Sequence, residues 1–230
     1  MSRSPALVLL FIVAGTFAAS TSAQVPPSSI EMGRYTGLLA AAASGDVDAL
    51  RAYLQSGADT DVRDNYGRTP LHVAAYGGRH EVMGLLVAAG ADPNALEADR
   101  YDIVTIAAVA NDARTLQAAL ALGGKAGNVT SPYDGTALIA AAHLGHVEVV
   151  RILLRAGAPV DHVNNLNWTA LIEAIVLGDG GRRHADIVAL LVDAGADVNL
   201  ADGNGRSPRE LARGRGFAEM VTILDTAGAR

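Results

Sequence analysis

A short motif that recurs at a nearly fixed interval is the feature that most limits how this chain can fold. Gly-Ala-Asp and its variants recur after 33, 33, 34, 38 and 33 residues, starting at Gly57, Gly90, Gly123, Gly157, Gly195 and Gly228. The residue after each Ala-rich segment has nearly the same period, at Gly45, Gly78, Asn111, Gly145, Gly178 and Gly216. Each series contains one step that is five residues longer than the usual 33, and the two long steps overlap only after Gly178. This places a five-residue insertion at Asp179–Arg183. This period indicates stacked repeats, none of which buries its apolar face alone.

Each repeat is expected to contain two short helices, and the second repeat shows this most clearly. Thr69 can cap a helix whose first turn accepts Pro70, and the Ala-rich residues 71–76 follow. Gly78 can end that helix in the left-handed conformation, and a second helix over residues 81–88 has its apolar residues on one face. The polar, turn-rich segment between successive units predicts a projecting hairpin loop.

The sequence Thr69-Pro70-Leu71-His72-Val73-Ala74, the glycine at the inter-helix turn and the terminal Gly-Ala-Asp resemble the ankyrin repeat. Related but degraded motifs begin at Asp102, Thr136 and Thr169, and the one at Asp102 is the least similar. The resemblance implies an all-α ankyrin-repeat solenoid of about six helix-turn-helix units with projecting hairpin loops, over residues 31–230. The units are expected at residues 31–63, 64–96, 97–130, 131–163, 164–201 and 202–230, and the first and last are polar enough to cap the array.

Residues 1–23 differ from the rest of the chain. One charge at Arg3, an apolar run over residues 6–19 and small residues up to Ala23 are typical of a secretory signal peptide. The run has 14 residues, whereas a helix needs about 20 to span a bilayer. We therefore expect cleavage after Ala23, a linker over residues 24–30, and no stable membrane insertion afterwards. The repeat domain would be exported, to the periplasm of a Gram-negative bacterium or otherwise secreted.

Composition narrows the range of partners. The chain has no cysteine, so an exported stack must be held by apolar packing without disulfides. The formal net charge is −6, and it becomes −7 once Arg3 is removed, which disfavours a nucleic-acid partner. The resemblance to ankyrin repeats implies a protein partner, and we expect a monomer without a cofactor.

The resemblance also implies a concave binding surface, lined by hairpin tips and first helices. Repeats three to five place aromatic and apolar residues at positions of this surface, and Trp and Tyr are enriched at interface hot spots. The predicted partner-binding residues are Tyr101, Tyr133, His143, Leu144, Trp168, Val176 and Leu177, with Trp168 as the first candidate. A purely structural interpretation is that Val176 and Leu177 pack under the insertion and that Trp168 covers a neighbouring hairpin.

An alternative hypothesis is a small-ligand or metal-dependent sensor or enzyme, centred on His143, Glu173 and the loop from Gly178 to His184. Glu173 stands where first helices usually have an apolar residue, so a partly buried carboxylate beside His143 could act as a base. The same carboxylate could instead be held by Thr105 or by backbone donors. The loop places two arginines and several glycines before a helix, as an anion site would, but it lacks a P-loop lysine.

Metal binding and catalysis lack a supporting motif. His162 and Asp179 could add ligands to His143, Glu173 and His184, but no pair of these residues has compact ligand spacing. The chain has no nucleophile elbow, zinc-binding helix or paired-carboxylate motif. We therefore expect a non-catalytic protein with no catalytic residue and no metal ligand.

Overall fold

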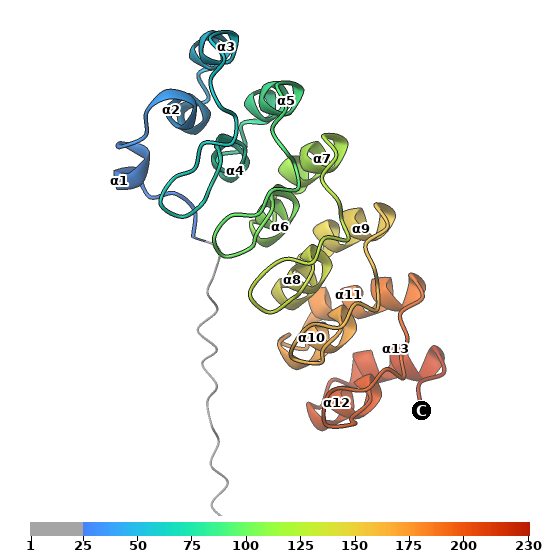
Figure 1. Ribbon diagram of the computed structural model, residues 1–230. Helices are drawn as coiled ribbons and strands as arrows, with labels where there is room; N and C mark the ends of the chain where they lie inside the picture. Colours follow the sequence, from blue (N-terminus) through green and yellow to red (C-terminus); the bar gives the residue numbers. More distant parts are fainter. Residues whose placement is uncertain (1–24) are drawn as a thin grey trace, which may run out of the picture.

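The computed structural model describes residues 25–230, so the predicted signal peptide lies outside the described residues. In this range six pairs of helices follow one another along one stack, after one short extra helix (Figure 1). The helices are α1 (Ser29–Met32), α2 (Gly37–Ser44), α3 (Val47–Gln55), α4 (Pro70–Tyr76), α5 (His80–Ala88), α6 (Ile103–Val109), α7 (Ala113–Ala121), α8 (Ala137–Leu144), α9 (Val147–Arg155), α10 (Ala170–Val176), α11 (Arg182–Asp193), α12 (Pro208–Gly214) and α13 (Ala218–Thr226). The described residues form no strand, and none of their helices is long and apolar enough to cross a membrane. The predicted all-α stack of helix pairs is confirmed.

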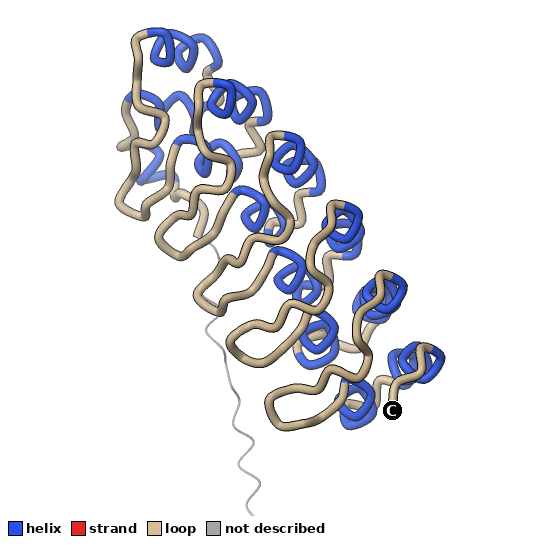
Figure 2. Tube along the Cα trace, turned by 45° about the vertical axis from the view of Figure 1, so that its right-hand side comes forward, coloured by secondary structure: helices blue, strands red, loops and turns tan. Residues whose placement is uncertain are grey.

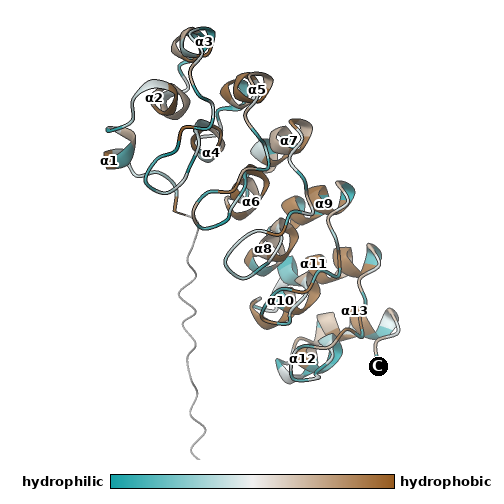
Figure 3. Ribbon diagram, in the orientation of Figure 1, coloured by the Kyte–Doolittle hydropathy of each residue, from teal (hydrophilic) through white to brown (hydrophobic). Residues whose placement is uncertain are grey.

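The helices form two rows. The inner row comprises α2, α4, α6, α8, α10 and α12, and the outer row comprises the odd-numbered helices from α3 to α13; each helix contacts its pair partner and its counterpart in the next repeat. The loops that join successive repeats project beyond the inner row on one side of the stack (Figure 2). Hydrophobic residues concentrate in the helices and hydrophilic residues in the loops (Figure 3). We call the surface formed by the projecting loops and the inner row the inner face.

Capping residues fix where the inner helices begin and end. Thr69 caps α4, and its side chain accepts from the backbone N–H of His72. In the least regular repeat Asp102 takes this role, and its carboxylate accepts from the N–H of Thr105 at 2.8 Å. Asn111 follows α6 with φ 54°, which confirms that an asparagine can replace the usual glycine in this left-handed position. The divergent third repeat therefore keeps both helix ends.

His72 links two successive hairpin loops through its ring. The residue is 1% exposed, and its Nε2 lies 3.0 Å from the carbonyl oxygen of Ala95 and 3.2 Å from that of Tyr101. Its Nδ1 lies 2.8 Å from Thr69 Oγ1. Burial lowers the pKa of His72 to about 4. The histidine of the repeat motif is thus a structural residue of the core.

An ion-pair cluster attaches the segment before the first repeat to the stack. Arg68, which is 1% exposed, donates to Asp64 Oδ2 at 2.7 Å, Glu31 Oε1 at 2.8 Å and the carbonyl oxygen of Val25 at 3.1 Å. The hydroxyl of Tyr35 donates to the same Asp64 oxygen at 2.6 Å. The region expected to be a linker therefore leads into a short helix, α1, that is bonded to repeat two.

Candidate functional site

Exposed apolar side chains occur at equivalent places in repeats four and five. Leu144 ends α8 and Leu177 directly follows α10, and they are 38% and 41% exposed. Each lies eight residues after the capping threonine of its repeat, at Thr136 and Thr169 (144 − 136 = 177 − 169 = 8). The equivalent positions of the other repeats hold Ser44, Gly77, Ala110 and Arg215. At this position a large exposed apolar residue therefore occurs only in repeats four and five.

The hairpin tips of these two repeats are bonded to each other. Tyr133, on the tip before α8, is 40% exposed. The backbone N–H of Asn165 donates to the carbonyl oxygen of Tyr133 at 3.0 Å, and the Asn165 side chain donates to the carbonyl oxygen of Pro132 at 3.1 Å. These bonds hold the Tyr133 backbone against the hairpin that bears Trp168.

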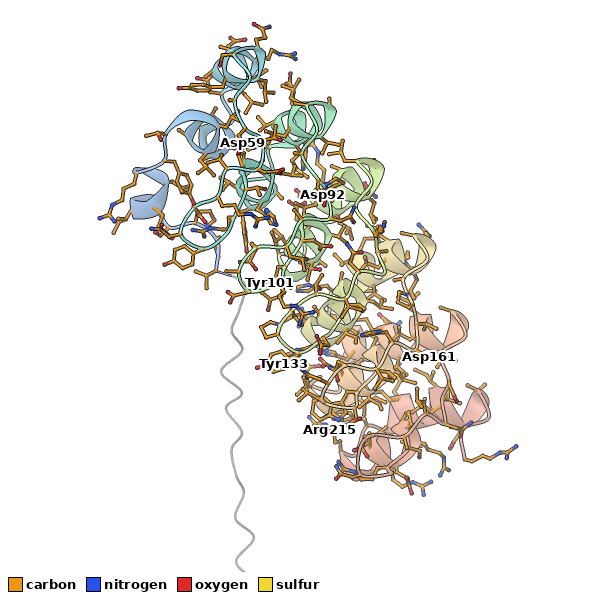
Figure 4. All side chains as sticks on the ribbon, viewed as in Figure 1. Asp59, Asp92, Tyr101, Tyr133, Asp161 and Arg215 are labelled. Carbon is orange, nitrogen blue, oxygen red and sulfur yellow. The ribbon has the colours of Figure 1, made fainter. Side chains whose placement is uncertain are left out.

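Trp168 and Tyr101 contribute less surface than the sequence suggested. The two residues stand at the same place in their repeats, one residue before the helix cap, where repeat two has Arg68. Tyr101 is 7% exposed and belongs to the hydrophobic core, so it offers little area to a partner. Figure 4 shows Tyr101 and Tyr133 on successive hairpin loops. Trp168 is partly buried and packs against the same core. Val176 is likewise half-buried, so the exposed apolar part of the predicted site is Tyr133, Leu144 and Leu177.

A buried carboxylate and an imidazole lie between the inner helices of repeats four and five. Glu173 on α10 is 6% exposed, and its Oε2 lies 3.5 Å from Nδ1 of His143 on α8. Its Oε1 accepts from the side-chain amide of Asn164 at 2.9 Å. Burial raises the pKa of Glu173 to about 7. Neither Thr105 nor a backbone donor holds this carboxylate; the partner is Asn164, a residue that the sequence analysis did not identify.

The electrostatics of His143 follow from its neighbours. Burial lowers the pKa of His143, and the positive charges that His184 and His146 acquire when protonated lower it further. The His143 side chain is 29% exposed, so the ring forms part of the surface above the buried carboxylate. At neutral pH the ring is neutral, and it can accept a hydrogen bond.

His184 does not join His143 and Glu173 in a three-residue site. Its Nδ1 lies 2.8 Å from Asp179 Oδ1, and its Nε2 lies 3.0 Å from the carbonyl oxygen of His143. Both ring nitrogens are thus engaged in holding the insertion against repeat four. His162 bonds instead to the carbonyl oxygen of Asp134 at 2.7 Å. Among residues 25–230 no group of three His, Cys, Asp or Glu side chains could hold a metal ion.

The last two residues of the insertion are helical, which corrects the expected Gly-rich loop over residues 178–184. Only three residues of the insertion, Asp179–Gly181, precede α11, and Arg182 and Arg183 form its first turn. Arg182 pairs with Asp186 one turn later, at 2.8 Å. The alternative anion site therefore has one of its two arginines already paired with a carboxylate.

The stack of helix pairs with projecting loops defines a helical-repeat protein, and comparison with known sequences identifies the family. A family model described as ankyrin repeats (3 copies) matches residues 104–202, and another, ankyrin repeats (many copies), matches residues 38–87. The chain is 35% identical over 192 residues to the ankyrin repeat protein YahD of Escherichia coli (strain K12), covering 83% of this chain and 95% of that protein. The chain belongs to the ankyrin-repeat family.

Solved structures agree with this assignment. An ankyrin repeat domain from Acinetobacter baumannii AYE is 42% identical, with a TM-score of 0.79 over 84% of this chain and 98% of that chain. The ankyrin repeat domain of Bcl-3, a member of the IkappaB protein family, is 31% identical, with a TM-score of 0.76 over 86% of this chain and 88% of that chain. Ankyrin repeats generally mediate protein–protein interactions, and the fold is typically non-enzymatic.

Proposed function

We propose that this protein is a non-catalytic scaffold that binds a partner protein on its inner face, at repeats three to five. The observation that carries the proposal is the pair Leu144 and Leu177, which are 38% and 41% exposed at equivalent positions of adjacent repeats. Large apolar side chains at solvent-exposed positions cost solubility, and a contiguous patch of them usually marks an interaction surface. Tyr133, bonded through its backbone to the next hairpin, adds an aromatic side chain of the kind enriched at hot spots.

Site-specific photocrosslinking tests this proposal with a matched control. The photoreactive amino acid p-benzoylphenylalanine replaces Tyr133 in one variant and Tyr53 in the other. These tyrosines are 40% and 42% exposed, but Tyr53 lies on the outer helix α3. We expect irradiation of the native host to give a protein adduct at position 133 that is absent at position 53. The adduct should be lost when Leu144 and Leu177 are both replaced by aspartate. Equal labelling at both positions, or adducts that survive the aspartate substitutions, would refute binding at this face.

We also propose that the scaffold acts outside the cytoplasm. The support is the charge at Arg3 followed by the apolar run of residues 6–19, with small residues up to Ala23. Mass spectrometry of the protein recovered after expression of the complete chain should show a mass that lacks residues 1–23. Recovery of the intact 230-residue chain from the cytoplasmic fraction would contradict export.

A further inference from the structure

Glu173 has fewer hydrogen-bond partners than any other buried carboxylate in residues 25–230. Asp202 accepts from the N–H groups of Asn204 and Arg206 and from the Arg206 guanidinium. Asp102 accepts from the N–H of Thr105 and from the Asn128 side chain. Glu97 accepts from two backbone N–H groups. Glu173 has one bond, from Asn164 to Oε1.

The second oxygen of Glu173 therefore has no full hydrogen bond. His143 Nδ1 lies 3.5 Å from Oε2, which is beyond the usual length of such a bond. A buried carboxylate without a donor or a counter-charge is costly, and the cost is removed by a proton or by a cation. No lysine or arginine in residues 25–230 forms a salt bridge with Glu173.

The surroundings of this oxygen fit an ammonium group on an aliphatic chain. Oε2 lies 3.5 Å from His143 Nδ1, and in the neutral tautomer that carries its proton on Nε2 this nitrogen is a second acceptor. Both can lie at about 2.9 Å from one ammonium nitrogen placed beside them, a normal hydrogen-bond length. The apolar residues Val176 and Leu144 lie on the same two helices, where they can cover the methylene groups of a long side chain.

We propose that the inner face between α8 and α10 binds a lysine side chain of the partner protein, whose ammonium group donates to Glu173 Oε2 and His143 Nδ1. The inference rests on the proposed function, because it assigns the chemistry of one contact in that interface. Lysine is favoured over arginine because Oε1 already accepts from Asn164, so Oε2 is the carboxylate oxygen left without a donor and a bidentate guanidinium would have to share Oε1. A compact ammonium needs only one.

An NMR titration with n-butylammonium tests the inference without the partner. The protein recovered from expression of the complete chain is titrated at pH 8, where Glu173 is ionised, and the ring signals of His143 are followed. n-Butanol, which has the same chain without the charge, is the ligand control, and Glu173→Gln is the protein control. We expect saturable shifts with n-butylammonium and at least about tenfold weaker binding for either control, since a hydrogen bond to a charged group contributes about 1.5 kcal/mol or more.

Three results would overturn the lysine site: equal shifts with n-butanol, unchanged binding in Glu173→Gln, or no shift up to about 0.1 M ligand, well above the millimolar range of weak complexes. Circular dichroism confirms that the variant is folded. The photocrosslinking at position 133 is independent of this titration. Adducts without ammonium binding would refute the lysine site alone, and ammonium binding without adducts would refute the proposed scaffold function alone.

Discussion

Replacing Glu173 by glutamine should make the protein more stable at alkaline pH and leave its stability nearly unchanged at acidic pH. Glutamine has the shape of the protonated glutamic acid, so it can keep the bond from Asn164 to Oε1. It lacks the ionised form, which burial disfavours. The variant therefore lacks the free-energy cost of burying a carboxylate, which the parent protein has at alkaline pH.

The magnitude follows from the two pKa values. The pKa of Glu173 is raised from 4.5 to about 7 in the folded protein, so the fold favours the neutral carboxyl group. The stabilisation of that form is fully present below pH 4.5, is lost as the pH rises towards 7, and is absent above it. One pKa unit corresponds to about 1.4 kcal/mol. Linkage then gives a free-energy cost of about 1 kcal/mol at pH 5 and about 3 kcal/mol at pH 8. The stability gained by Glu173→Gln should therefore grow by about 2 to 3 kcal/mol between these pH values.

Urea unfolding at both pH values measures this difference. Far-ultraviolet circular dichroism reports on the whole stack, and the fluorescence of Trp168, the single tryptophan, reports on repeat five. Coincident transitions are required, because long repeat arrays can lose two-state behaviour. Taking the difference between variants at each pH cancels the titration of all other groups, including His72.

A second substitution of the same type provides the control. Glu148→Gln removes a carboxylate on α9 whose side chain is 59% exposed, where solvent already screens its charge. We expect its free energy of unfolding to differ from that of the parent by the same small amount at pH 5 and pH 8. If Glu173→Gln shows no more pH dependence than Glu148→Gln, then Glu173 is not held in a desolvated environment and the reasoning fails.

Three further predictions concern the stack itself. NMR titration of the His72 ring should give a midpoint near pH 4 instead of 6.5. Because the fold favours the neutral ring, the stability contributed by His72 is lost as the pH falls from 6.5 to 4. A midpoint above about pH 6 would contradict the burial of this ring. Urea unfolding should show that Gly178→Ala is destabilising by about 2 kcal/mol, because a methyl group there would overlap the carbonyl oxygen of Ala174. The matched Gly84→Ala change, with nothing within 4 Å, should stabilise α5 by about 1 kcal/mol, and equal effects of both changes would refute the packing argument. Arg68→Ala should lower the free energy of unfolding by about 3 kcal/mol by leaving two carboxylates without their cation, and a loss below about 1 kcal/mol would mean that the cluster is not stabilising.

The sequence predicted the helices well because each is defined by local signals. The expected helix over residues 71–76 is observed as Pro70–Tyr76, and the one over residues 81–88 as His80–Ala88. Capping side chains and left-handed residues act within one turn of chain, so they can be recognised without knowledge of the fold. Asn111 is an example: it stands in the series of glycines that follow the inner helices, and its φ of 54° is left-handed like that of most of them.

The environment of the candidate site could not be predicted in the same way, because it depends on contacts between repeats. Tyr101 and Trp168 occupy the same place in their repeats, yet Tyr101 is 7% exposed and Trp168 is only partly buried. The bond from Asn164 to Glu173 joins residues nine positions apart across a hairpin and a helix. Arg182 and Arg183 have no repeat counterpart, so the period gave no indication that they would extend α11.

Three departures from the repeat pattern that carry a cost lie close together in repeat five, and this is the strongest argument that repeat five does more than hold the stack together. Glu173 places a buried carboxylate where other inner helices have Val73, Ile106 or Ala140. Leu177 exposes a large apolar side chain, and the insertion Asp179–Arg183 follows directly. Each departure carries a cost in stability or solubility that an array built only for stability would avoid. Several losses of stability or solubility within one repeat are expected where the surface of that repeat binds a partner.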